Sequence, residues 1–159
     1  KIEKVVFGAG ATGEQLDRGV KLLKMLTNKK PMKTKSRKRI PTLQVRPGLE
    51  VGAVVTIRDK KEIENILKKM LATIDNTLKK KQVAENHLSF GIKEYIEIPG
   101  AEYQRDIGIR GFNVTIVFAR AGVRVKRKKI KQGRLPRRQH IPALEIMNFM
   151  EEQFKTVFN

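Results

Sequence analysis

The chain has 159 residues, of which 40% are hydrophobic, and it contains no cysteine. This length suits one domain with a substantial core, and the missing cysteines exclude a disulfide framework and thiolate metal sites. Because no apolar stretch reaches the roughly 18 residues of a membrane span and no export leader is recognisable, we expect a cytoplasmic protein without a membrane partner.

Charge is the dominant global feature, since 35 lysines and arginines stand against 16 aspartates and glutamates, a net charge of +19. Two segments without any acidic residue, 29–39 and 120–138, hold 7 and 10 of the basic residues. A charge run is often a solvated face, but acid-free clusters repel themselves, and a polyanion would offset that repulsion. Both segments contain proline or glycine and no tryptophan, which is not typical of a membrane-surface helix. Nucleic acid is therefore the expected partner.

The first predicted unit is a strand, a glycine loop and a helix. Residues 2–7 are typical of a strand, and "GAGATG" at 8–13 follows as a Gly-x-Gly-x-x-Gly loop. Thr12 and Gln15 match a capping box, and apolar residues then recur at helical spacing up to Asn28, a permissible C-terminal cap.

The middle of the chain predicts a hairpin and a second helix. Pro47-Gly48 lies between two extended segments, the second of which is the β-branched run 51–58. Asp59 and Glu62 mark the start of the clearest helix. Its apolar stripe, expected to face a core, comprises Ile63, Ile66, Leu67, Met70, Leu71, Ile74 and Leu78.

The last third predicts two strands and a final helix that begins at Pro142. One strand places Phe90, Ile92, Ile96 and Ile98 on one face; the other does so with Val114, Ile116 and Phe118; the helix turns Met147, Met150, Phe154 and Val157 inward. We predict an α+β fold, with one antiparallel-rich sheet that has helices on one face and leaves the other face for RNA.

The glycine loop resembles a dinucleotide-binding fingerprint, but the surrounding sequence argues against that ligand. Such a site needs a βαβ unit and an acid about twenty residues past the glycines, and no acid occurs between Asp17 and Glu50. Glycines at a helix start can also approach an RNA phosphate. His87 and His140 lack metal-ligand or catalytic partners at recognisable spacing, so no enzyme, metal or cofactor is predicted.

Six blocks in register resemble the universal 5S-rRNA-binding protein family of the large ribosomal subunit, in its archaeal form. They are "KIEKVVFGAGATGEQL", "LTNKKPMKTKSRKRI", "QVRPGLEVGAVVTIRD", "SFGIKEYIEIPG", "DIGIRGFNVTI" and "RRQHI". The resemblance covers the whole chain and implies a single ribosomal RNA-binding domain over 1–159.

This resemblance implies a structural constituent of the large subunit that binds 5S rRNA in the central protuberance. The implied partners are 5S rRNA, large-subunit rRNA, P-site tRNA, neighbouring large-subunit proteins and a small-subunit protein at an intersubunit bridge. The alternatives are a non-ribosomal RNA chaperone and a nucleotide-binding enzyme that uses the "GAGATG" loop.

The resemblance also assigns residues, position by position. The 5S rRNA surface would contain Gly8, Gly10, Thr12, Lys29, Lys30, Lys33, Thr34, Lys35, Arg37, Lys38, Thr56 and Arg58. The tRNA-facing loop would be Arg39, Ile40, Pro41, Thr42, Leu43, Gln44, Val45 and Arg46. The second basic segment would contact rRNA through Arg124, Lys126, Arg127, Lys128, Lys129, Lys131, Arg134, Arg137, Arg138 and His140. Structural roles in the sheet are expected for Phe90, Gly91, Ile109 and Gly111.

Overall fold

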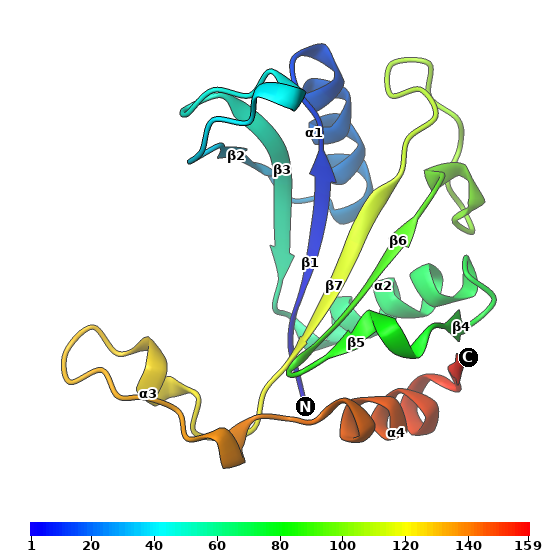
Figure 1. Cartoon of the computed structure of the whole chain (residues 1–159). Helices are drawn as coiled ribbons and strands as arrows, with labels where there is room; N and C mark the ends of the chain where they lie inside the picture. The colour runs from blue at the N-terminus through cyan, green and yellow to red at the C-terminus, as the bar shows by residue number, and fades with distance from the viewer. The chain divides into compact units, whose positions relative to one another are not determined.

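Four helices and eight strands make up the computed structural model, which describes residues 1–159 (Figure 1). The helices are α1 (Glu14–Thr27), α2 (Lys60–Ala72), α3 (Arg124–Arg127) and α4 (Ala143–Phe154). The strands are β1 (Ile2–Gly10), β2 (Met32–Lys35), β3 (Glu50–Ile57), β4 (Thr77–Leu78), β5 (Val83–Ala84), β6 (His87–Ile92), β7 (Phe112–Phe118) and β8 (Val157–Phe158). Short 3-10 turns occupy Pro41–Leu43, Lys80–Gln82, Tyr95–Glu97 and Arg137–Gln139.

Six strands form one sheet in the order β2-β3-β1-β7-β6-β5, and β4 pairs with β8 in a separate two-stranded ribbon. The pairs β2–β3 and β5–β6 are antiparallel, whereas β4 and β8 are parallel. The predicted α+β fold with an antiparallel-rich sheet is confirmed.

The chain divides into two compact units. We call the first the α2/α4 unit, which comprises Lys1–Val5, Arg58–Phe90 and Thr115–Asn159. The second is the α1 unit, which comprises Val6–Ile57 and Gly91–Val114. The prediction of a single domain over 1–159 remains a prediction.

In the α1 unit, one helix covers the apolar side of the strands. Leu16, Leu22 and Leu23 are buried on one face of α1, as the helical period requires. The ring centroids of Phe7 and Phe112 lie 6.1 Å apart beneath that helix, and both side chains are buried. Burying such aromatic and leucine side chains contributes roughly 1.5–3 kcal/mol each, which makes this cluster the main stabilising element of the unit.

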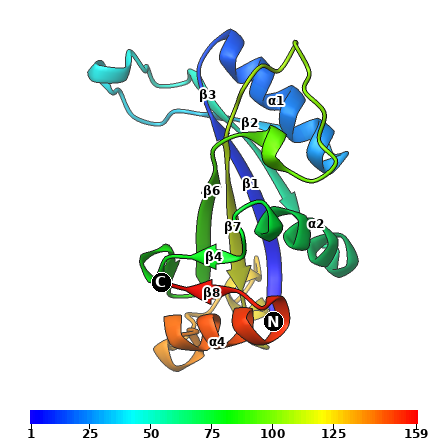
Figure 2. The same ribbon diagram turned by 90° about the vertical axis from the view of Figure 1, so that its right-hand side faces the viewer.

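In the α2/α4 unit, two helices supply the core, and Figure 2 shows them from a second side. The α2 helix begins at Asp59, whose carboxylate accepts a hydrogen bond from the Lys61 amide at 3.1 Å. It buries Ile63, Leu67, Met70 and Leu71, and α4 buries Ile146 and Met150. Phe149 of α4 meets the Phe118 ring edge-on at 5.8 Å, which fixes the helix against the end of β7.

The strands separate apolar residues from small or polar ones by strict alternation. Val5, Phe7 and Ala9 of β1 are buried, and Val114, Ile116 and Phe118 of β7 are buried as predicted. The intervening positions are exposed or half-buried, and in β6, β7 and the second half of β1 most of them are glycine, serine, threonine or asparagine: Gly8, Gly10, Ser89, Gly91, Asn113 and Thr115. One side of these strands therefore carries almost no bulky side chain.

Two expectations near the first helix need correction. β1 continues through Gly10, so Gly8 and Gly10 are strand residues, and only residues 11–13 form the connection to α1. The predicted capping box is wrong, because Gly13 is the N-cap and no side chain caps the helix. Gly13 has φ +59°, a left-handed conformation that glycine adopts without strain and that takes the place of a cap. The C-terminal cap at Asn28 is confirmed, with φ 50°.

Three boundaries further along the chain also differ from prediction. The second helix ends at Ala72, since Asp75 and Asn76 adopt left-handed conformations and Leu78 is buried in β4. The strand predicted to reach Ile98 ends at Ile92. There, a turn at 95–97 buries Tyr95 in place of Ile96, because the Tyr95 hydroxyl accepts a hydrogen bond from the Gln104 amide at 2.8 Å.

The last helix faces inward differently from prediction. Ile146 and Met150 are its buried residues, whereas Met147 and Phe154 are half-buried. Val157 is 57% exposed, in β8. The inward stripe is thus shifted relative to the predicted one, and it leaves Phe154 partly open to solvent.

Two glycines make opposite steric predictions. A Cβ on Gly111 would lie 2.5 Å from the carbonyl oxygens of Ile92 and Lys93, whereas a Cβ on Gly8 would meet nothing within 4 Å. We expect Gly111→Ala to lower the free energy of unfolding by about 1–3 kcal/mol, as overpacking against backbone does. Gly8→Ala should change it by less than about 0.5 kcal/mol. Urea unfolding of both variants checks this, and equal losses would contradict it.

Candidate nucleic-acid interface

A side-chain-poor opening lies on the exposed side of the α1 unit. Its volume is about 460 Å³, and four glycines, Gly8, Gly10, Gly91 and Gly111, contribute to its lining with Lys93 and Asn113. At Gly8 and Gly10 an added Cβ would point into open space. A flat or extended ligand can approach the backbone here more closely than at any strand position that carries a side chain.

The glycines act through this close approach rather than through free amides. β1 is hydrogen-bonded to β3 on one side and to β7 on the other, so its backbone donors are engaged in the sheet. The start of α1 is not an anion site either, because Glu14 and Asp17 occupy its first turn. Thr12 lies exposed in the connection between β1 and α1.

The sheet topology contradicts a dinucleotide site at "GAGATG". A dinucleotide fold would place the strand after α1 parallel to β1, with an acid at its end. Instead β2 pairs antiparallel with β3, in the register Met32↔Val54 to Lys35↔Glu50. The glycines of β1 therefore lie outside a nucleotide-binding βαβ unit.

The first basic segment forms one arm of the β2–β3 hairpin. Its register shifts between Thr34 and Lys35, and the Thr34 hydroxyl lies 2.9 Å from where a Cβ of Gly52 would be. Most of the predicted RNA-binding cations of this segment are exposed: Lys30, Lys33, Lys35, Arg37 and Lys38. Lys29 is half-buried and engaged in an interaction within the protein.

Lys33 differs from the other cations because two carboxylates already neutralise it. Its ammonium group lies 2.9 Å from the Asp17 carboxylate and 3.1 Å from that of Glu50. Hydrogen bonds to Asp17 and then Glu50 raise the pKa of Lys33 above its ordinary value of 10.5. These pairs therefore stabilise the folded state below that value, and their contribution is lost as the pH rises through the folded-state pKa. A phosphate at Lys33 would have to compete with both carboxylates.

The predicted tRNA-facing loop is a closed turn at the tip of the same hairpin. Ile40 and Val45 form an isolated bridge, with backbone hydrogen bonds of 2.9 and 3.1 Å in the two directions. Between them Pro41–Leu43 form a 3-10 turn that ends at Gln44, whose φ is 53°. Val45 is buried and anchors the loop, while Leu43 is 67% exposed at its tip. The turn thus presents an apolar side chain between Arg39 and Arg46, the first and last residues of the predicted loop.

The end of β3 divides the remaining predicted site residues. Thr56 is half-buried on β3 in the α1 unit, and Arg58 is exposed in the α2/α4 unit. The structure therefore brings the glycines, Thr12, the hairpin cations and Thr56 into one unit and describes Arg58 in the other.

The second basic segment belongs to the α2/α4 unit and is held at its base by Asn86. The Asn86 carbonyl accepts a hydrogen bond from the Phe118 amide at 2.8 Å, and its side-chain oxygen accepts one from the Ile141 amide at 2.9 Å. Ion pairs of Arg127 with Glu3 and of Arg120 with Glu145 add to this closure. His140 lies 3.3 Å from Glu85, so its predicted phosphate contact would also have to compete with a carboxylate.

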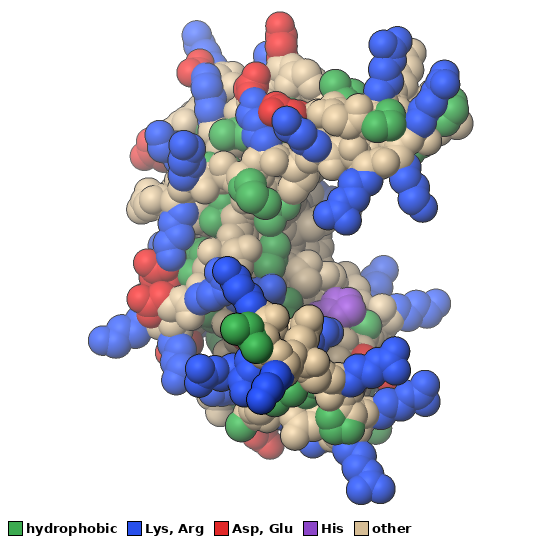
Figure 3. Space-filling view, turned by 90° about the vertical axis from the view of Figure 1, so that its left-hand side faces the viewer, with side chains coloured by type: hydrophobic (Ala, Val, Ile, Leu, Met, Phe, Trp, Pro, Cys, Tyr) green, Lys and Arg blue, Asp and Glu red, His purple; other side chains and the backbone are tan.

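Between these anchors the segment projects its cations into solvent. Figure 3 shows Lys and Arg side chains gathered over α3 and, separately, over the β2–β3 hairpin. The exposed predicted contacts are Arg124, Lys126, Arg127, Lys128, Lys129, Lys131, Arg134, Arg137 and Arg138. Such clusters bind polyanions through release of counterions.

Sequence reasoning misplaced one residue and missed two. Ile109, expected to shape the sheet, is 65% exposed in the connection before β7. Lys93 and Asn113 line the glycine opening but are absent from the predicted site. The signal for Asn113 was a polar residue at an outward position of a strand; Lys93 carried no comparable signal.

Comparison with known proteins identifies related chains. Residues 50–142 match the family model that describes the C-terminus of the uL5 ribosomal proteins. The large ribosomal subunit protein uL5 of Nanoarchaeum equitans is 37% identical over 96% of this chain and 92% of its own length. Those of Methanosphaera stadtmanae and Sulfolobus acidocaldarius are 36% and 38% identical, over 93% and 94% of this chain and 88% and 84% of their own lengths.

Proposed function

Because the chain belongs to the uL5 family of ribosomal proteins, in its archaeal type, we propose that its glycine-lined face and β2–β3 hairpin bind 5S rRNA. As a family member, the chain is a structural constituent of the large ribosomal subunit, and ribosomal RNA is its partner. None of its helices combines the length and apolar character that a membrane crossing requires.

The observation that carries the proposal is the opening of about 460 Å³ on the α1 unit. Folded RNA is recognised largely through its shape, its sugar hydroxyls and its phosphates, so a face that admits a sugar-phosphate backbone closely suits this ligand. Asn113 offers a side-chain amide at this opening, and Lys93 offers a cation. Exposed hairpin cations such as Lys35, Arg37 and Lys38 would neutralise neighbouring phosphates.

We further propose that the turn at 39–46 contacts P-site tRNA. The bridge between Ile40 and Val45 supports this role, because a preformed loop loses less conformational entropy on binding. Arg39 and Arg46 would meet phosphates, while the exposed Leu43 would pack against a sugar or a base.

The family resemblance supplies the remaining parts of the proposal. In it the 5S rRNA complex lies in the central protuberance. The second basic segment would bind large-subunit rRNA, and neighbouring large-subunit proteins and a small-subunit protein at an intersubunit bridge would contact the chain.

Selectivity for 5S rRNA is the first test. In an equimolar competition at about 150 mM salt, the protein should prefer 5S rRNA to tRNA-sized structured controls by about 1,000-fold or more, since specific sites exceed non-specific binding by that margin. Equal binding to all RNAs would instead identify a general RNA chaperone. Micromolar, saturable binding of NAD or ATP in calorimetry would favour the nucleotide-binding enzyme and contradict this use of the glycines.

A bulky side chain at Gly10 should separate RNA binding from folding. Because a Cβ there meets nothing within 4 Å, we expect Gly10→Val to change the free energy of unfolding by less than about 0.5 kcal/mol. The same variant should weaken 5S rRNA binding by about tenfold or more, since it fills the space that the RNA backbone would occupy. Filter binding and urea unfolding measure the two effects. Ala84→Val, on the exposed edge strand β5, is the control and should leave RNA affinity unchanged.

Release of Lys33 from its carboxylates should strengthen RNA binding. In Asp17→Asn/Glu50→Gln the ammonium group becomes free for a phosphate, so the slope of log affinity against log salt should steepen by about one. Glu102→Gln/Asp106→Asn removes the same charge from the same unit and serves as the control. An equal gain in both variants, or a gain that survives Lys33→Met, would contradict a role for Lys33.

A further inference from the structure

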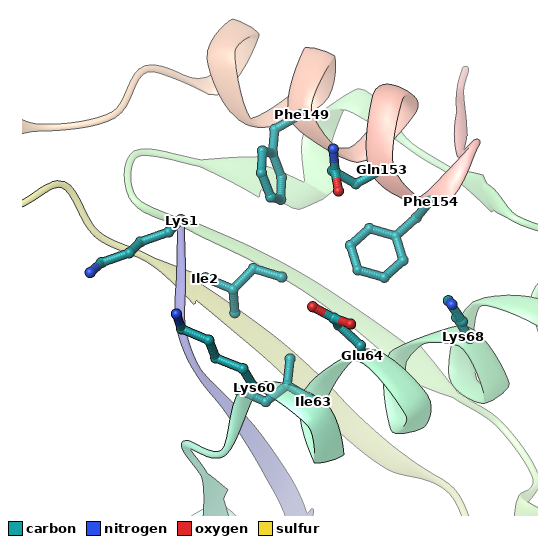
Figure 4. Close-up of a pocket in the computed structure, with 9 residues that line it drawn as sticks. All are labelled: Lys1, Ile2, Lys60, Ile63, Glu64, Lys68, Phe149, Gln153 and Phe154. Carbon is teal, nitrogen blue, oxygen red and sulfur yellow. The ribbon is translucent and has the colours of Figure 1, made fainter.

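A groove between α2 and α4, within the α2/α4 unit, is not used by the RNA-binding surface proposed above. Its central cavity has a volume of about 300 Å³, within the range of ligand pockets. Figure 4 shows the residues that line it: Lys1 and Ile2 from β1; Lys60, Ile63, Glu64 and Lys68 from α2; Phe149, Gln153 and Phe154 from α4.

The floor of this groove is apolar and its wall is firmly held. Ile2 and Ile63 lie on one side, and the rings of Phe149 and Phe154 hang from α4 on the other (Figure 4). The edge-on contact with Phe118 fixes the Phe149 ring. The groove is therefore a preformed apolar surface that an aliphatic or aromatic side chain could fill.

The groove continues past Phe154. A second cavity of about 400 Å³ shares Lys68, Gln153 and Phe154 with the first and extends to Leu71 and Asn76. The lining residues of α2 thus run from Lys60 to Leu71, close to the whole length of that helix. A channel of this length suits a stretch of polypeptide better than a single small molecule.

The rim on the α2 side is positively charged. Lys60 and Lys68 are eight residues apart, which is about 12 Å along a helix, and neither forms an ion pair. Glu64 lies midway between them and Gln153 faces it from α4, so both can bond to the main chain of an occupant (Figure 4). The cations and the apolar floor call for an occupant that has carboxylates on either side of an apolar anchor.

We propose that this groove binds an acidic amphipathic segment of a protein partner. Its carboxylates, about 12 Å apart, would pair with Lys60 and Lys68, and the apolar anchor between them would enter the cavity beside Phe149 and Phe154. The proposal goes beyond RNA binding and does not depend on 5S rRNA.

The charge of α4 favours a protein over a polynucleotide. The three charged residues of that helix are all acidic, Glu145, Glu151 and Glu152, and the groove itself contains the carboxylate of Glu64. A phosphate at every nucleotide would meet repulsion from this side of the groove. A peptide can place its carboxylates beside the lysines alone.

The test uses large ribosomal subunits that carry this chain. A photoreactive benzoylphenylalanine replaces Gln153 in one variant and Glu64 in a second, so that each wall of the groove holds a probe. After irradiation, mass spectrometry identifies the cross-linked peptide. Both probes should capture the same protein segment, with Asp or Glu on each side of a Leu, Ile, Met or Phe anchor.

A matched pair of charge variants makes the test specific. Lys60→Glu/Lys68→Glu should reduce the cross-link by about tenfold or more, since like charges at an interface rim are strongly unfavourable. Lys61→Glu/Lys69→Glu reverses two exposed charges on the same helix outside the groove and should leave the cross-link unchanged. If the first variant fails to enter large subunits in sedimentation, Lys60→Gln/Lys68→Gln replaces it and should still reduce the cross-link.

The remaining outcomes overturn the proposal. They are a cross-link to rRNA, to a second copy of this chain or to a segment without carboxylates, no cross-link from either probe, and equal losses in the two charge variants. The RNA competition and the Gly10→Val measurement are independent of these results. Failure here therefore leaves 5S rRNA binding untouched, and the reverse also holds.

Discussion

Side-chain alternation along the strands is the constraint on which both the core and the RNA-facing surface depend. Successive residues of a strand point to opposite faces, so each apolar residue that enters the core fixes the direction of its neighbour. In β1, Phe7 and Ala9 face the helix, and Gly8 and Gly10 must then face away from it. A register slip of one residue would expose Phe7 and bury the glycines, which would cost the core and the open face together.

The distribution of charge follows from a similar separation. Outside the two basic segments the cations and carboxylates nearly balance, and inside them no acid dilutes the charge. The fold keeps these cations at the surface and anchors the segments through uncharged groups, Asn86 at one base and Val45 in the other segment's loop. Lys33 is the exception, since Asp17 and Glu50 hold it within the protein's own charge network.

Much of the fold could be predicted from sequence because long periodic segments carry their own signal. The stripe that begins at Ile63 and the alternation of Val114, Ile116 and Phe118 both survive in the structure. The errors lie where tertiary partners decide the outcome. Tyr95 leaves the strand pattern because Gln104 supplies a partner for its hydroxyl, and Leu78 leaves the helix because β8 supplies a strand for β4 to pair with. The site shows the same limit: glycines and cations were visible in sequence, whereas the pairing of Lys33 with Asp17 depends on the folded geometry.

The closure at Asn86 also bears on how this chain can vary in length. Because Phe118 and Ile141 are both bonded to one residue, the segment between them begins and ends at fixed points whatever its own conformation. The entropy of closing such a loop grows only with the logarithm of its length, about 0.6 kcal/mol for each doubling. Insertions or deletions in this segment would therefore alter the reach and number of its cations at little cost to folding, which makes it a part of the molecule that can be remodelled while the sheet stays the same.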